Sequence, residues 1–144
     1  MFSKACEYGI RASIFIALSS FEGMRVSTKE IAAKIDSPTA FTAKILQSLV
    51  KHNVINSVKG VSGGFEIDKN RIKDVKLSDI VDAIDGDSIY KGCGLGFNAC
   101  DEYRPCPMHD RFKVVREELK TMLECTNLET LALDIKEGDT FLKR

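Results

Sequence analysis

A mostly α-helical fold with one small β-hairpin is predicted by three features of this 144-residue sequence. Apolar residues recur at helical spacing along most of the chain. The stretch VINSVKGVSGGFEI (54–67) alternates like two strands around a glycine-rich turn. Two helical segments separated by a tight break precede it. Helix, helix, helix, hairpin is the order of a winged helix-turn-helix, and a long, highly charged helical stretch near the C-terminus completes the predicted architecture.

The composition is that of a globular protein, with 44% hydrophobic and 29% charged residues. At this length we expect one domain, or a small domain with an appendage. No apolar run approaches the roughly 18–20 residues that span a membrane, and residues 1–13 lack signal-peptide features, so we expect a cytoplasmic protein without membrane contact. An odd number of cysteines, five, argues against a disulfide scaffold and favours reduced thiols that can bind metal.

Charge is distributed unevenly although the formal net charge is zero. Residues 1–76 carry twelve Lys and Arg against seven Asp and Glu, a net of +5. Residues 77–144 carry nine against fourteen, a net of −5. Only the surface that contacts DNA must be positive, so a basic first half is compatible with nucleic-acid binding.

Three helices are predicted in the first half, and each begins at a helix-start signal. The first has apolar residues around most of its axis, which predicts a buried central helix. The segments are 3–20, 28–35 and 38–52. Their predicted caps are Ser3, a capping box of Ser27 and Glu30, and Ser37 ahead of Pro38.

The third helix has two different faces. One is apolar and belongs in the core: Phe41, Ile45, Leu46 and Leu49. The other is small, polar or cationic and contains no acid: Ala40, Lys44, Gln47 and Lys51. Such a face suits a major groove, because Lys binds guanine or phosphate and Gln pairs with adenine. A solvated helix face is the plainer interpretation of these residues alone.

The hairpin after this helix favours the DNA-binding interpretation. Its turn would form the wing, with Lys59, Ser62, Gly63 and Gly64 at the tip. One cation and several backbone amides free of bulky side chains suit phosphates or a minor groove. An ordinary hairpin turn has the same composition, but its position directly after the third helix favours a wing.

Three further helices are predicted in the acidic half. Ser78 is a candidate cap for an acidic bridging helix that ends at Gly86. From Pro107 to about Cys125 the apolar residues recur as a heptad seam with charged flanks, which favours pairing with a second copy of the helix: Met108, Phe112, Val115, Leu119 and Met122. Thr126 and Glu129 form a capping box for the last helix.

We divide the chain into three parts of one structural unit. Residues 1–76 form the winged helix, 77–106 the bridging helix and a cysteine-rich loop, and 107–144 the dimerisation and C-terminal helices.

The cysteine loop, Gly92–His109, has the spacing C-x6-C-x5-C-x2-H. Its thiols and imidazole are candidate ligands: Cys93, Cys100, Cys106 and His109. Three cysteines and a histidine are a legitimate zinc set, but structural zinc sites usually use a tighter C-x2–4-C pair. The wide gaps and glycines let the loop enclose something larger than one ion, which favours an iron–sulfur cluster and keeps zinc as the alternative. Cys6 and Cys125 lie outside the loop and are not expected to bind metal.

Nearly the whole chain resembles the IscR/NsrR-type winged-helix transcriptional regulators, which include iron–sulfur sensors and cluster-free CymR-type relatives. The resemblance depends on EYGIRA, on SPTAFTAKILQSLVKHNVINSVKGVSGGFEI, on LSDIVDAIDG and on the three-cysteine loop. It implies a homodimer that binds double-stranded DNA and carries a [2Fe–2S] cluster, or [4Fe–4S] as in some nitric-oxide sensors.

The resemblance also implies roles for particular residues. Cys93, Cys100, Cys106 and His109 match the ligands of the family's biogenesis regulators, although the first gap is one residue longer here. In the nitric-oxide sensors the fourth ligand is an acidic residue of the partner subunit's first helix, and Glu7 matches that position; we favour His109. Residues 38–44, including Thr39, and the wing would contact DNA. Phe41 replaces a tyrosine of some relatives, which leaves the base preference open.

The sequence therefore predicts a homodimeric transcriptional regulator whose DNA affinity is switched by an iron–sulfur cluster. The alternative is a zinc-stabilised or metal-free winged-helix regulator that acts through a protein or small-molecule partner. An enzyme is not expected, because the chain has no Ser/His/Asp set, paired carboxylates or phosphate loop.

Overall fold

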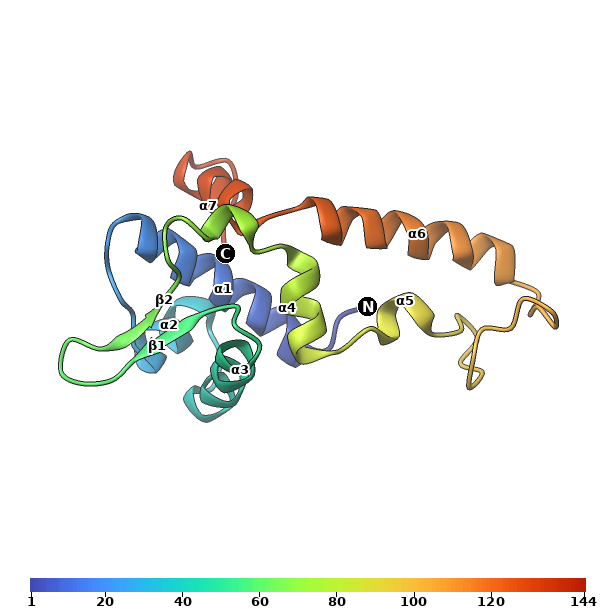
Figure 1. The fold of residues 1–144 in the computed structure, drawn as a ribbon, viewed down its shortest axis with the longest axis horizontal. Coiled ribbons are helices and arrows are strands. Elements are labelled where there is room, and N and C mark those ends of the chain that lie inside the picture. The colour runs from blue at the N-terminus through green and yellow to red at the C-terminus, as the bar shows by residue number, and fades with distance from the viewer.

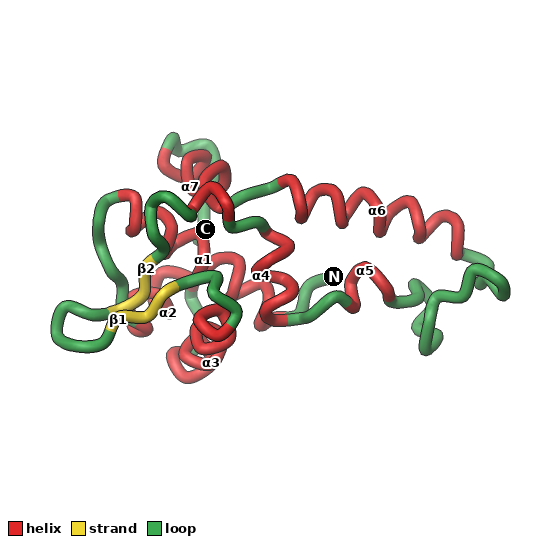
Figure 2. The backbone as a smooth tube through the Cα atoms, in the orientation of Figure 1, coloured by secondary structure: helices red, strands yellow, loops and turns green.

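In the computed structural model, residues 1–144 form seven α-helices, one short 3₁₀ helix and a two-stranded antiparallel sheet (Figure 1). This confirms the predicted fold class, mostly α with a small wing. Helices α5 and α6 extend away from the body, and the loop between them lies at the far end (Figures 1 and 2). The bounds are α1 Lys4–Phe21, α2 Thr28–Ile35, α3 Thr39–Lys51, β1 Asn56–Val58, β2 Gly64–Glu66, η1 Ile72–Asp74, α4 Leu77–Ile84, α5 Ser88–Lys91, α6 His109–Cys125 and α7 Leu128–Lys136.

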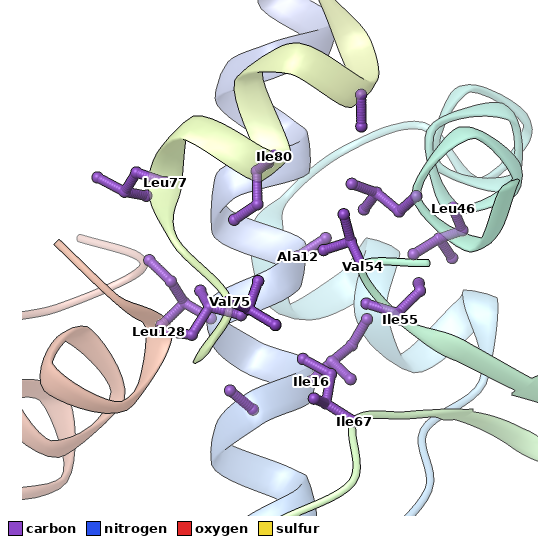
Figure 3. Close-up of a cluster of buried hydrophobic side chains, with 14 of the residues drawn as sticks. Ala12, Ile16, Leu46, Val54, Ile55, Ile67, Val75, Leu77, Ile80 and Leu128 are labelled. Atoms are coloured by element: carbon purple, nitrogen blue, oxygen red, sulfur yellow. The ribbon is translucent and has the colours of Figure 1, made fainter. Parts of the chain in front are cut away.

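Helix α1 is the centre of the core, as its apolar composition predicts. Ala12, Ile16 and Ala17 are completely buried, and aliphatic side chains from α3, α4, α7 and the hairpin surround the helix (Figure 3). The fully buried Ile67 directly follows β2, and its backbone N–H donates to the hydroxyl of Ser20 at 3.0 Å. The hairpin is therefore fixed to the same core as the helices.

Two of the predicted helix starts in the first half are confirmed, and one is wrong. The Ser3 hydroxyl accepts from the Cys6 N–H at 3.0 Å. Ser27 and Glu30 form the capping box. Helix α3 instead begins after Pro38 without a side-chain cap, because the Ser37 hydroxyl is hydrogen-bonded to that of Thr42.

Both predicted caps in the second half are displaced by one or two positions. Ser78 lies inside α4, and the Asp79 carboxylate accepts from the N–H of Lys76 at 2.8 Å. Thr126 ends α6, and Asn127 caps α7 by accepting from the Thr130 N–H at 2.9 Å. The cause is long-range: Lys76 and Asn127 form a β-bridge, which holds both in extended conformations immediately before their helices.

Gly9 sets how closely α1 and α4 approach. A Cβ at this position would lie 2.1 Å from Cδ1 of Ile84 and 3.4 Å from Cγ2 of Ile45. We expect Gly9→Val to lower the free energy of unfolding by about 1–3 kcal/mol, because a β-branched side chain must displace the Ile84 side chain and overpack the contact with Ile45. Denaturant unfolding measures this, with Ala33→Val on the exposed face of α2 as the control. Equal losses in both variants would contradict a tight crossing.

Candidate functional site

The predicted DNA-facing side of α3 is on the surface. The exposed residues are Thr39, Ala40, Lys44, Gln47 and Lys51, and the opposite face is buried through Thr42, Ile45, Leu46 and Leu49. Neither Lys44 nor Lys51 forms an ion pair, so both ammonium groups are free to meet an anionic ligand. The C-terminus of α3 is closed by His52, whose Nδ1 lies 2.8 Å from the Ser48 carbonyl oxygen.

Phe41 is not in the core, so its sequence-based assignment was wrong. Its side chain is 37% exposed and meets the Tyr8 ring edge-on, with 5.8 Å between the ring centroids. The Arg11 guanidinium lies over the Tyr8 ring, 4.8 Å from its centroid. Phe41 therefore links the first turn of α3 to a cationic, aromatic strip on α1.

The wing is braced against the body. β1 and β2 pair with Ser57 opposite Phe65, and Phe65 also forms a bridge with Val26 ahead of α2. Arg25 forms an ion pair with Glu66 at 3.0 Å and donates to the Ser62 carbonyl at 3.3 Å. The wing-tip side chains of Lys59 and Ser62 are exposed, and Lys59 forms no ion pair.

Glycine is required at the base of the wing. A Cβ at Gly63 would lie 2.2 Å from the Val58 carbonyl oxygen. Gly64 has a φ of +138° and lies against the backbone of Val26. The two glycines are half-buried and shape the turn, while Lys59 and Ser62 present its polar groups.

The four predicted ligands of the cysteine loop form two pairs. The Sγ atoms of Cys93 and Cys106 are 4.0 Å apart, and the Cys100 Sγ lies 3.2 Å from Nδ1 of His109. No three His, Cys, Asp or Glu side chains converge closely enough to hold a single metal ion. His109 is the first residue of α6 and is only 7% exposed, whereas the three cysteines are half-buried in the loop.

Besides His109, three side chains of α6 contact this loop. The Phe112 ring covers Gly94, where a Cβ would lie 2.6 Å from the ring atoms. Lys113 forms an ion pair with Glu102 at 2.9 Å. Arg116 donates to the Gly92 carbonyl and, at 3.3 Å, to the Cys100 sulfur.

The electrostatic environment differs between the Cys93 thiol of the loop and the Cys6 thiol in the core. Backbone hydrogen bonds, the largest from Leu95 and the next from Phe97, lower the pKa of the Cys93 thiol and favour the thiolate that binds metal. Burial, followed by the charge of Asp85, raises the pKa of the Cys6 thiol to about 12. Cys6 is therefore a small buried apolar residue, as expected, and Cys125 is exposed at the end of α6.

Glu7, the alternative fourth ligand, lies on the exposed first turn of α1. Its carboxylate forms an ion pair with Lys4 at 3.2 Å. Helix α1 lies in the body, whereas the cysteine loop lies at the far end of α6 (Figure 1). Within one protomer the structure brings His109, and not Glu7, to the loop cysteines.

The heptad seam of α6 is only partly covered. Phe112 is half-buried against the cysteine loop, and Leu119 packs against the body core. The other three residues of the seam are exposed and recur at seven-residue intervals along one line. They are Met108 at 37%, Val115 at 53% and Met122 at 46%. Lys and Glu residues flank this line.

Some contributions to the site were not predicted. Arg116 was interpreted only as a charged flank of the seam, and the short helix α5 was not predicted. Helical or strand periodicity does not reveal the Arg116 contact, because its partner Cys100 lies in a loop sixteen positions away in the chain. Helix α5 is only four residues long, too short to show a periodic pattern. The Tyr8–Phe41 contact was also missed, although Tyr8 and Arg11 at three-residue spacing mark one helix face.

This fold and surface define a winged-helix, DNA-binding transcriptional regulator. The chain belongs to the Rrf2 family: the family model described as "Iron-dependent Transcriptional regulator" matches residues 2–134. It is accordingly a transcriptional regulator and not an enzyme. Membership in this family confirms the resemblance inferred from the sequence motifs.

Relatives and solved structures agree with this assignment. An HTH-type transcriptional regulator of Aquifex aeolicus is 29% identical over 143 residues, covering 98% of this chain and 96% of that protein. An rrf2-like HTH-type regulator of Rhodobacter capsulatus is 31% identical over 108 residues, covering 74% and 69%. CymR, the global cysteine regulator of B. subtilis, has a TM-score of 0.75 at 20% identity, covering 92% and 96%. IscR of T. potens has a TM-score of 0.74 at 19% identity, covering 97% and 91%.

None of the helices combines the length and apolar character that a membrane crossing demands.

Proposed function

We propose that this regulator is a homodimer whose affinity for DNA is switched by an iron–sulfur cluster bound to the cysteine loop. The observation that carries the proposal is the arrangement of three thiols and one imidazole as two donor pairs beside the start of α6. The family's description as iron-dependent supports iron as the metal.

The donor set fits a [2Fe–2S] cluster better than one zinc ion. Such a cluster takes two protein ligands on each iron, and thiolates and imidazole are both accepted ligands. Cys93 with Cys106, and Cys100 with His109, would supply one pair each. A single zinc ion requires four donors around one point, and these four residues do not converge there. When bound, the cluster supplies a group that redox agents or nitric oxide can alter or remove.

The exposed line on α6 supports dimerisation. Apolar side chains every seven residues with charged flanks suit pairing with the same helix of a second copy. In this dimer α6 would transmit a conformational change of the cysteine loop to the winged-helix body. Its contacts with α4 and the bridge between Lys76 and Asn127 provide the connection. The free-energy difference that this switch requires is modest. If the bound cluster favours one dimer geometry by about 1.4 kcal/mol, the DNA affinity changes tenfold.

Anaerobic purification tests the cluster. We expect visible absorbance together with about two iron and two sulfide per protomer, as a [2Fe–2S] group requires. Fluorescence anisotropy on DNA selected from a random pool should give different affinities for loaded and chelator-treated protein. Stoichiometric zinc without iron, and an affinity that does not respond to chelation, would instead support the zinc-stabilised regulator.

The α3 lysines provide a separate test of DNA binding. We expect Lys44→Ala with Lys51→Ala to weaken binding by roughly 10- to 100-fold and to reduce the salt slope by about 2, because two phosphate contacts are lost. The control is Lys120→Ala with Lys136→Ala, two exposed cations in α6 and α7, which lie away from α3 (Figure 1). An equal loss in both double variants would remove α3 from the proposed interface.

A further inference from the structure

Arg116 contacts the cysteine loop at two separated points. The half-buried side chain projects from the middle of α6. One guanidinium nitrogen donates to the backbone carbonyl of Gly92, where the loop begins, and another lies 3.3 Å from the Cys100 sulfur, near its middle. A planar guanidinium with several fixed donors can satisfy two acceptors at once, which a lysine ammonium does less well.

The other attachments of the loop are of different kinds. Gly94 lies against the Phe112 ring, an apolar contact near the first cysteine. The Lys113–Glu102 ion pair is 46% and 69% exposed, and exposed pairs contribute little. Inside the loop, the N–H of Gly96 donates to the Cys93 carbonyl at 2.9 Å. Arg116 is therefore the polar attachment that connects the Cys93 and Cys100 segments through one rigid group.

We propose that Arg116 is a positioning residue with two effects. In the metal-free protein it holds the loop so that Cys100 stays beside His109 and near the Cys93 segment. In the loaded protein, and here the inference rests on the proposed function, it donates a hydrogen bond to a ligating sulfur. Hydrogen bonds to ligand sulfurs stabilise the more negative, reduced state of a cluster and raise its reduction potential.

The first effect is tested on metal-free protein by hydrogen exchange. In Arg116→Gln we expect the Gly96 amide to exchange at least about tenfold faster, because charge-assisted hydrogen bonds are lost. Arg116→Lys keeps the charge without the two-point attachment and should resemble Arg116→Gln. The control is Arg111→Gln, an exposed arginine of the same helix without an ion pair or hydrogen bond. Exchange as slow as in the control would overturn the holding role.

The second effect is tested on protein reconstituted with iron and sulfide. The reduction midpoint of the cluster in Arg116→Gln should be more negative than in wild type and in Arg111→Gln, at equal iron content. Equal midpoints would overturn the contact with the ligating sulfur. If wild type itself takes up no cluster, the proposed function fails, while the exchange measurement on metal-free protein still decides whether Arg116 holds the loop.

Discussion

Val115→Asp is expected to convert the proposed homodimer to a monomer and to weaken binding to a two-fold symmetric DNA site by roughly 100-fold or more. The side chain lies at the middle of the exposed line on α6 and is 53% exposed, so its replacement leaves the protomer core intact. In a paired helix the two aspartates would be buried close to each other within the apolar line. Desolvation and like-charge repulsion then cost several kcal/mol, and each 1.4 kcal/mol is a factor of ten.

Sedimentation equilibrium measures the association, and anisotropy on selected DNA measures the affinity. The matched control is Thr121→Asp, which introduces the same charge at an exposed position of α6 outside the apolar line. Circular dichroism should show unchanged helix content in both variants. A dimer of Val115→Asp as stable as that of Thr121→Asp would place the interface elsewhere.

Local sequence signals predicted most of the fold, because each helix start or turn depends on residues a few positions apart. The Ser27–Glu30 capping box and the glycine turn of the wing are of this kind. The Thr126 cap was wrong because Asn127 is held extended by its bridge to Lys76, fifty-one positions away in the chain. A local pattern contains no information about such a partner.

The candidate site shows the same division. The spacing of Cys93, Cys100, Cys106 and His109 indicated a ligand set, but only the fold shows that they form two pairs. Phe41 lies on the apolar side of the third helix, where a core residue is expected. In the structure its ring instead meets Tyr8 of α1 near the surface and is 37% exposed. Periodicity gives the direction of a side chain; tertiary contacts determine what it meets there.

Cys106→Ala is expected to abolish binding of the proposed cluster, with iron content falling to background and visible absorbance lost. Its sulfur is paired with that of Cys93, and removing one of two donors leaves an iron with a single protein ligand. The matched control is Cys125→Ala, which removes an exposed thiol outside the loop and should leave the iron content unchanged. Iron retained by Cys106→Ala would disprove the ligand assignment.

The fourth ligand is distinguished by a second pair of variants. His109→Ala should release iron faster and change the visible spectrum, because the imidazole lies 3.2 Å from the Cys100 sulfur and is fixed at the start of α6. Glu7→Gln should leave both properties unchanged, since its carboxylate is paired with Lys4 on the body of the protomer. The reverse result would mean that the ligand set closes across the dimer through the carboxylate on α1. In that case the cluster would itself connect the two subunits, and its loss would weaken the dimer as well as alter DNA binding.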